Sequence, residues 1–217
     1  MTKYITFTCI VACFFFAAAQ SKASSECDAV TGNLVANCGF ETGDFTSWTL
    51  SGNDTPTELN NLYGVEGTDP DGTSPHSGND QAYFGDLQAN ATTISQSIAT
   101  TAGQQYTITF YVAQDADPNS GGPRYDDELQ ASFGGTTFVD LSDIPAEGYT
   151  EYTGIVDATS GTSVLDLTLG NDLGYYQLDD VSVVATPEPD SLLLFGTGLL
   201  ALAGVTRRRL RSQASGH

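Results

Sequence analysis

The middle of the chain alternates apolar and polar residues with a period of two. In QQYTITFYVAQ, residues 104–114, apolar side chains occupy the even positions from Tyr106 to Val112, and threonines or a tyrosine occupy the odd positions between them. In TSVLDLTLG, residues 162–170, three leucines oppose Val164, Asp166 and Thr168. A period of two is typical of a β-strand with one buried face, so both stretches predict strands.

Four further stretches have a similar composition, and turn residues separate all six. They are TTISQSIAT at 92–100, DELQASFGG at 127–135, YTEYTGIVDA at 149–158 and YYQLDDVSVVA at 175–185. Dipeptides typical of turns, such as Asp71-Gly72 and Ser160-Gly161, lie between the stretches. Residues 24–186 show no convincing helical period. Many short strands with regular turns predict an all-β domain, a sandwich or barrel of antiparallel strands.

The N-terminus has the features of a secretory signal peptide. Lys3 precedes an uncharged apolar run of 16 residues from Tyr4 to Ala19, and small residues follow. A membrane anchor is the alternative, but the run is shorter than the roughly 20 residues of a spanning helix. We expect residues 1–23 to be a signal peptide, cleaved after Ala19 or Ala23.

The C-terminus combines an apolar segment with a basic cluster. Residues 192–205 contain only one polar residue, Thr197, and Arg207, Arg208, Arg209 and Arg211 follow. The segment is short for a membrane span, but the arginines lengthen it by reaching the interface, and their charge keeps that end in the cytoplasm. We expect a hydrophobic membrane helix. The alternative is a buried core helix, against which the arginine cluster argues.

Charge is distributed very unevenly along the chain. Residues 24–186 contain 25 of the 27 acidic residues but only one of the 7 basic residues, Arg124, so their net charge is near −24. This excludes nucleic acid as a partner, because phosphate binding requires Lys and Arg, and an anionic membrane surface is unsuitable for the same reason. The charge favours high solubility or the binding of divalent cations.

Two cysteines, Cys27 and Cys38, remain after removal of the signal peptide. An even pair in an exported domain predicts a disulfide rather than two free thiols, because the compartment is oxidising. The bond would close a short loop and stabilise the fold by roughly 2–3 kcal/mol.

The last part of the chain resembles a known sorting signal. Pro187, Glu188 and Pro189, the apolar segment and the basic end with Arg207, Arg208 and Arg209 occur in the order and spacing of the PEP-CTERM sorting signal. The resemblance covers residues 187–212. It implies a protein exported by a Gram-negative bacterium that makes exopolysaccharide, transiently anchored in the inner membrane and processed by an exosortase-type membrane protease.

Three stretches of residues 24–186 carry a second resemblance. They are NLVANCGFETGDFTSWTLSG at 33–52, DQAYFGD at 80–86 and LGNDLGYYQLDDVSVV at 169–184. Together they resemble the jelly-roll, galactose-binding-like domains that are related to carbohydrate-binding modules. The resemblance implies a jelly-roll β-sandwich over residues 24–186, with Trp48 packed in its core.

This second resemblance also implies a metal site. In the carbohydrate-binding relatives the first and last strands lie side by side and often hold a calcium ion. Carried over, Glu41 and Asp180 would be ligands, with Asp179 as a substitute and backbone carbonyls completing the site. Hard oxygen donors suit Ca²⁺, and a cation offsets the repulsion of neighbouring carboxylates. We expect a structural Ca²⁺ here; the alternative is that these carboxylates are solvated at a strand end.

Tyrosines in or beside turns are candidates for stacking on sugar rings. Tyr125 stands next to Arg124, the only cation of residues 24–186, and is the first candidate pair. Tyr175 and Tyr176 are further candidates for a ligand-binding face. The alternative is that these rings pack on half-buried strands with their hydroxyls in water.

Catalysis finds little support in the sequence. His76 is the only histidine of residues 24–186 and lies in a flexible-looking turn, GTSPHSGND. No nucleophile elbow, Cys–His pair or zinc motif is present. We expect an exported, non-catalytic protein of the cell envelope or extracellular matrix, associated with exopolysaccharide. Two alternatives remain: a structural surface protein without a specific ligand, and a glycan-degrading enzyme, which needs only two carboxylates.

Overall fold

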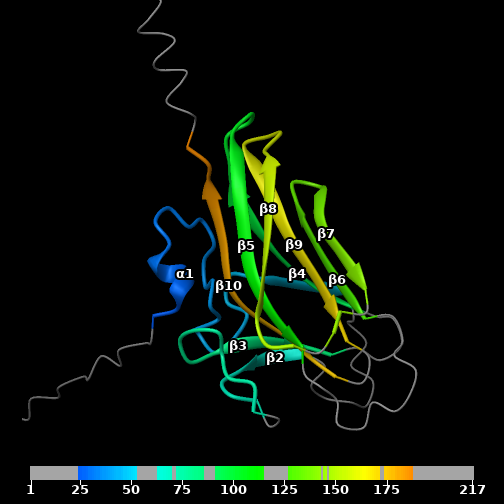
Figure 1. Ribbon diagram of the computed structural model, residues 1–217. Coiled ribbons are helices and arrows are strands. Elements are labelled where there is room, and N and C mark those ends of the chain that lie inside the picture. Colours follow the sequence, from blue (N-terminus) through cyan, green and yellow to red (C-terminus); the bar gives the residue numbers. More distant parts are fainter. Residues whose placement is uncertain are drawn as a thin grey trace, which may run out of the picture.

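The computed structural model is a sandwich of two antiparallel sheets (Figure 1). It describes residues 24–52, 63–69, 72–85, 91–114, 127–142, 144–145, 147–171 and 174–187. The expected signal peptide, residues 1–23, and the expected hydrophobic helix after residue 187 lie outside these ranges. All further statements on structure concern the described residues.

Each sheet contains five strands. The first sheet has the order β1 (Thr49–Gly52), β4 (Thr92–Ala99), β9 (Thr162–Gly170), β6 (Glu128–Phe133), β7 (Thr136–Ser142). The second sheet has the order β2 (Tyr63–Glu66), β3 (Gln81–Phe84), β10 (Tyr176–Ala185), β5 (Gln105–Gln114), β8 (Thr150–Asp157). From β3 onward the chain passes back and forth between the sheets, with β6 and β7 as the one hairpin within a sheet. This arrangement is the expected jelly-roll β-sandwich.

The core lies between the sheets and is built by the alternating strands. In β5, residues 106, 108, 110 and 112 are buried and the residues between them are half-exposed. In β9, all three leucines are fully buried, whereas Val164 on the other face is exposed. Trp48 also belongs to the core, where its ring stacks on Phe40 with a centroid distance of 5.8 Å. The period of two therefore predicted the core faces of these strands correctly.

All six strands expected from alternation are present, and four further strands were not predicted. Three of the four, β1, β2 and β7, are edge strands. An edge strand on the rim of a sandwich buries few side chains, and β7 buries only Val139. The fourth, β3, has four residues of which three are buried, so it shows no alternation. A one-turn helix, α1 (Glu26–Ala29), was not predicted either, because four residues carry no helical period.

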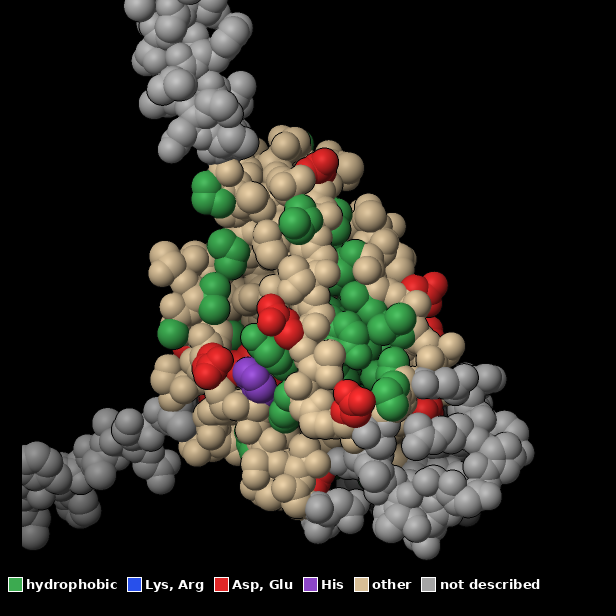
Figure 2. Space-filling view, in the orientation of Figure 1, with side chains coloured by type: hydrophobic (Ala, Val, Ile, Leu, Met, Phe, Trp, Pro, Cys, Tyr) green, Lys and Arg blue, Asp and Glu red, His purple; other side chains and the backbone are tan. Residues whose placement is uncertain are grey.

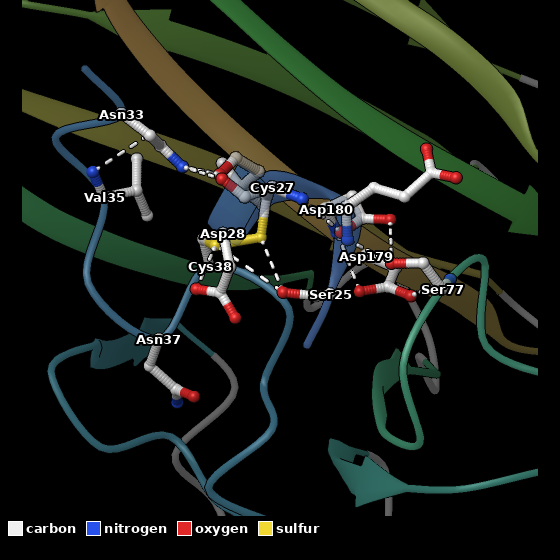
Figure 3. Close-up of a disulfide and its surroundings, with 12 residues drawn as sticks. Ser25, Cys27, Asp28, Asn33, Val35, Asn37, Cys38, Ser77, Asp179 and Asp180 are labelled. Atoms are coloured by element: carbon white, nitrogen blue, oxygen red, sulfur yellow. Dashed lines mark hydrogen bonds between the residues drawn. A yellow bond between two sulfur atoms is a disulfide. The ribbon is translucent and has the colours of Figure 1, made fainter. Parts of the chain in front are cut away.

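The opening segment of the domain runs beside the last strand, β10. The amide of Leu34 donates to the carbonyl of Val183 at 3.0 Å, and the amide of Val181 donates to the carbonyl of Cys38 at 3.0 Å. The predicted disulfide joins Cys27 of α1 to Cys38 of this segment. The bond therefore holds α1 against the outer side of the sheet, next to β10 (Figure 3).

A bulge interrupts β10 and redirects its side chains. The register with β5 shifts between Asp179 and Ser182, and Asp180 has a positive φ of 49°. Tyr176 and Leu178 face the core before the bulge, and Val181 and Val183 face it afterwards. Side chains of a regular strand alternate between faces, so the extra residue lets Asp179 and Asp180 both point away from the apolar core.

Candidate functional site

Asp180 lies at the junction of α1, β10 and the loop of residues 74–80. Its side chain is buried, and each of its oxygens accepts hydrogen bonds. Oδ1 accepts from the amide of Cys27 at 3.0 Å, and Oδ2 lies 2.7 Å from Nδ1 of His76 and 2.6 Å from the hydroxyl of Ser77. Asp180 therefore ties three segments together that are far apart in the sequence.

Asp179 is fully buried beside Asp180 (Figure 3). Its Oδ2 accepts from the amide of Ser77 at 3.1 Å, and its Oδ1 accepts from the amide of Asp180 at 2.7 Å. Burial, followed by the negative charge of Asp180, raises the pKa of Asp179 to about 8, against the lowering effect of the two amides; the charge of Glu41 adds to the rise. A carboxylate in this position is under electrostatic strain that a bound cation or a proton would relieve.

Glu41 reaches the same loop from the opening segment. Its Oε1 accepts from the amides of Asn79 at 2.7 Å and Asp80 at 3.2 Å. Gly78 has a positive φ of 69°, and a Cβ there would collide with the Glu41 carboxylate, so the close approach requires glycine. The three carboxylates expected at a metal site are thus brought together around one short loop. We call Glu41, Asp179, Asp180 and residues 76–80 the carboxylate junction.

His76 is held in place by this junction and by two tyrosines. Its ring stacks on Tyr111 of β5 with a centroid distance of 3.8 Å and contacts Tyr149 edge-on at 5.2 Å. Only 21% of the His76 side chain is exposed. The turn looked flexible in the sequence because of its Gly, Pro and Ser residues, but the hydrogen bond to Asp180 and the ring contacts fix its histidine. Sequence reasoning missed this role, since nothing in GTSPHSGND points to β5 or β10.

A groove runs along the outer face of the second sheet beside α1. Its volume is about 380 Å³, and β5 and β10 form its floor. The floor presents three hydroxyl side chains, Thr107, Thr109 and Ser182, together with the ring of Tyr111. The remaining lining residues come from α1 and the residue after it, from β8 and from β10: Glu26, Cys27, Val30, Glu151, Asp180, Val184. Figure 2 shows this face, with the histidine between acidic side chains and near apolar ones.

The groove is strongly negative. Burial raises the pKa of Tyr111, and the charges of Glu151, Glu26 and Asp180 raise it further in that order. The described residues contain neither lysine nor arginine, so no permanent cation of this part of the chain lies beside these charges. Nδ1 of His76 lies 2.7 Å from Asp180, a contact that is an ion pair when the histidine is protonated. The groove thus combines an aromatic ring, hydroxyls and carboxylates, which are the groups that bind sugars and cations in proteins.

The tyrosines expected to bind a ligand lie in different environments. Tyr175 is exposed and packs edge-on against Tyr83 with a centroid distance of 5.5 Å, away from the groove residues. Tyr176 is fully buried between the sheets, so the expectation that it lies on a binding face is wrong. Alternation in β10 turns residue 176 inward, and the sequence YY does not say which tyrosine faces out. Tyr125 and Arg124 lie outside the described residues.

The predicted sorting motif begins where β10 ends. Ala185 is the last residue of β10, and Pro187 follows as an exposed residue. The other motif residues, Glu188, Pro189, Arg207, Arg208 and Arg209, lie outside the described ranges. Within those ranges, no helix is both long and apolar enough to cross a membrane.

Comparisons with known proteins support two of the sequence expectations. Residues 185–209 match the PEP-CTERM protein-sorting motif, which confirms that expectation and indicates an exported protein sorted to the cell envelope. No curated protein sequence matches the chain. The match covers the tail only and leaves the activity of the preceding domain open.

Among solved structures, the fold is similar to carbohydrate-binding modules. TmCBM61 in complex with β-1,4-galactotriose has a TM-score of 0.50 and 20% identity, over 71% of this chain and 99% of that chain. A family 16 module has a TM-score of 0.47 and 12% identity, covering 70% and 99% of the two chains. The CBM22-1 xylan-binding domain from Paenibacillus barcinonensis Xyn10C has a TM-score of 0.45 and 15% identity, covering 70% and 93%. At such low identity the first likeness shows the jelly-roll fold alone.

Proposed function

We propose that this protein is an exported, non-catalytic glycan-binding protein of the cell envelope or extracellular matrix. The sorting motif supports the location, and the groove on the second sheet supports the binding. The observation that carries the proposal is the floor of the groove, where the Tyr111 ring lies among the side chains of Thr107, Thr109 and Ser182. A sugar offers an apolar ring face and hydroxyl edges, which an aromatic ring and hydroxyl side chains complement.

The proposal includes a processing step at the C-terminal sorting motif. After export, the apolar segment holds the chain transiently in the inner membrane, and an exosortase-type protease processes the chain near Pro187. The domain then works outside the cell, associated with exopolysaccharide. The motif match supports this order of events, because β10 ends only two residues before Pro187 and the motif directly follows the folded domain.

A structural Ca²⁺ at the carboxylate junction forms part of the proposal. The junction offers carboxylate oxygens, which suit a hard cation, and the raised pKa of Asp179 marks a place where positive charge is stabilising. Asp179 and Glu41 would hold the ion. Asp180 is the weaker candidate, because its two oxygens take part in three hydrogen bonds with protein groups, whereas Asp179 and Glu41 each accept two. The bound ion would neutralise the two acids and fix the loop against β10.

The glycan proposal is tested by titrating the purified protein with neutral oligosaccharides, β-1,4-galactotriose among them, and with exopolysaccharide from the host. We expect saturable binding that Tyr111→Ala weakens about tenfold, or roughly 1.4 kcal/mol. Tyr175→Ala is the matched control, because this exposed tyrosine lies outside the groove residues. Loss of binding in the Tyr175 variant but not in the Tyr111 variant would move the site away from the groove.

The calcium proposal has a separate test. EDTA is expected to lower the melting temperature, and added Ca²⁺ to restore it, because an ion that binds only the folded state stabilises it by mass action. Glu41→Gln should reduce the calcium response, whereas Asp140→Asn, an exposed acid of β7, should leave it unchanged. A melting temperature that is identical in EDTA and in Ca²⁺ would contradict the proposal.

A structural surface protein without a specific ligand is the second candidate. The observation in its favour is the charge, because a domain near −24 repels an acidic exopolysaccharide. It predicts no saturable binding to any glycan, with or without Ca²⁺. The titration above therefore decides between the two candidates.

A further inference from the structure

The charges in the groove restrict what it can bind. Two exposed carboxylates line the groove together with Tyr111: Glu151 on β8, the cross-strand partner of Tyr111, and Glu26 on α1, the helix that contacts β10. Asp180 of β10 lines the groove as well. All three act on the Tyr111 hydroxyl strongly enough to disfavour its ionisation. Their fields therefore add at the floor of the groove, where a ligand would lie.

No fixed positive charge of the described residues offsets these acids. They contain no lysine or arginine, and Figure 2 shows no basic side chain on this face outside the grey atoms. Asp180 has His76 and two further donors, but no ion pair between residues of the described ranges involves Glu26 or Glu151. An anionic glycan would be repelled here, and a neutral glycan would gain nothing from the charges of the two glutamates.

We propose that the groove binds a glycan with protonated amino groups, that is, an amino-sugar polymer that has lost some or all of its N-acetyl groups. This inference rests on the proposed glycan-binding function and specifies the charge of the ligand. Glu26 and Glu151 pair with ammonium groups along the polymer. The Tyr111 ring, the hydroxyls of Thr107 and Thr109, and Ser182 contact the sugar between the charges.

Two other cationic ligands fit the groove less well. A divalent metal ion would use Glu26, His76 and Asp180, whose ligand atoms lie within 4.8 Å of one another. However, Asp180 already accepts three protein hydrogen bonds, which a metal would have to displace. A basic peptide would satisfy the glutamates, but it does not offer the apolar ring face and hydroxyl edges that suit the Tyr111 ring and the hydroxyls of the floor.

The test compares four probes in calorimetric titrations of the purified protein at mildly acidic pH and low salt. They are a glucosamine oligosaccharide, the N-acetylglucosamine oligosaccharide of the same length, a galacturonic acid oligosaccharide and an oligolysine of the same charge as the first. We expect the glucosamine oligosaccharide to bind at least about tenfold more tightly than each of the others, with affinity falling as salt is added.

The variants Glu26→Gln and Glu151→Gln keep the shape of each side chain and remove its charge. We expect each to weaken glucosamine binding about threefold and the double variant about tenfold, as for partly exposed ion pairs. Asp140→Asn is the matched control, since it removes one exposed acid from β7 of the other sheet and should leave the affinity unchanged.

The possible results separate this inference from the proposal on which it rests. Binding of neutral or acidic oligosaccharides through Tyr111, as tight as that of glucosamine, would overturn the inference and keep the glycan-binding function. Equal binding of oligolysine would overturn it as well, because the groove would then recognise charge without sugar. If EDTA abolishes glucosamine binding and the glutamate variants do not change it, the amine contacts are wrong. Absence of binding to every oligosaccharide would remove both proposals.

Discussion

The carboxylate junction and the groove lie side by side on β10, yet their acids are in opposite situations. At the junction, Asp179 and Asp180 are buried and accept hydrogen bonds from Cys27, His76, Ser77 and the local backbone. In the groove, Glu26 and Glu151 are exposed and have no cationic partner among the described residues. Buried acids that make many hydrogen bonds stabilise a fold, whereas exposed acids without a cationic partner are available to a charged ligand. The difference predicts which variants unfold the protein and which change only binding.

The largest effect should come from Asp180→Ala. The change leaves the amide of Cys27, the ring of His76 and the hydroxyl of Ser77 without their acceptor, in a buried place. We expect a loss of about 3 kcal/mol in the free energy of unfolding, measured in urea. Relief of the repulsion with Asp179 makes the expected loss smaller than the sum of the three lost hydrogen bonds. An unfolding free energy equal to that of the wild type would contradict the idea that the junction organises the fold.

Removal of the disulfide should have an effect of similar size. The bond between Cys27 and Cys38 spans 11 residues and holds α1 beside β10. Cys27→Ala with Cys38→Ala should lower the free energy of unfolding by about 3 kcal/mol, the value for closing a short loop in the unfolded chain. A reducing agent should destabilise the wild type and leave the double variant unchanged. Equal effects of the agent on both proteins would contradict a stabilising disulfide.

A smaller effect is expected from the titration of Asp179 in calcium-free buffer. The pKa of this acid is raised from 3.8 to about 8, so the folded state holds a proton that the unfolded state has already lost between these values. Stability from this group is complete below about pH 4 and is lost as pH rises from there through about 8, by at most about 1.4 kcal/mol per pH unit. Denaturant unfolding at several pH values measures this loss.

The variant Asp179→Asn isolates that titration from the other groups nearby, which are Asp180, Glu41 and His76. Asparagine does not titrate, so the difference in stability between variant and wild type should change with pH in the direction described above. Added Ca²⁺ should suppress the pH dependence of the wild type, since the ion takes the place of the proton. A constant difference from pH 4 to pH 8 would show that Asp179 has an ordinary pKa.

The smallest change in stability is expected in the groove. Glu26→Gln and Glu151→Gln alter exposed side chains, so each should change the free energy of unfolding by less than about 0.5 kcal/mol. The same urea titrations measure this, with Asp140→Asn as reference. A loss above about 1 kcal/mol in either glutamate variant would mean that these acids belong to the fold, and the contrast between the two regions would no longer hold.

Much of the architecture could be predicted from local pattern. Alternation in β5 and β9 identified both the strands and their buried faces, because a strand with one buried face must alternate. The edge strands β1, β2 and β7 could not be found in this way, since they bury few side chains. Tyr176 was misassigned because two adjacent tyrosines fit either register, and only packing against the core decides which one turns inward.

The candidate site was predictable only in part. The stretches GFE and LDDV pointed to Glu41, Asp179 and Asp180, and the structure brings all three to one loop. The proposed preference for Asp179 over Asp180 as a cation ligand could not be predicted, because it depends on how many hydrogen bonds each acid already makes. His76, Tyr111 and Glu151 were not connected by any motif, since β5, β8 and the 74–80 loop meet only through the sheet order.

The sequence by itself determined the sorting motif, the excess of acids over bases, the disulfide pair and the strand pattern of an all-β sandwich. These properties depend on composition and on neighbours along the chain. Only the tertiary structure decided that a bulge turns two aspartates to the same side of β10, that His76 stacks on Tyr111, and that Glu26 and Glu151 flank one groove. Such contacts join residues up to 153 positions apart, and long-range packing, rather than local preference, selects them.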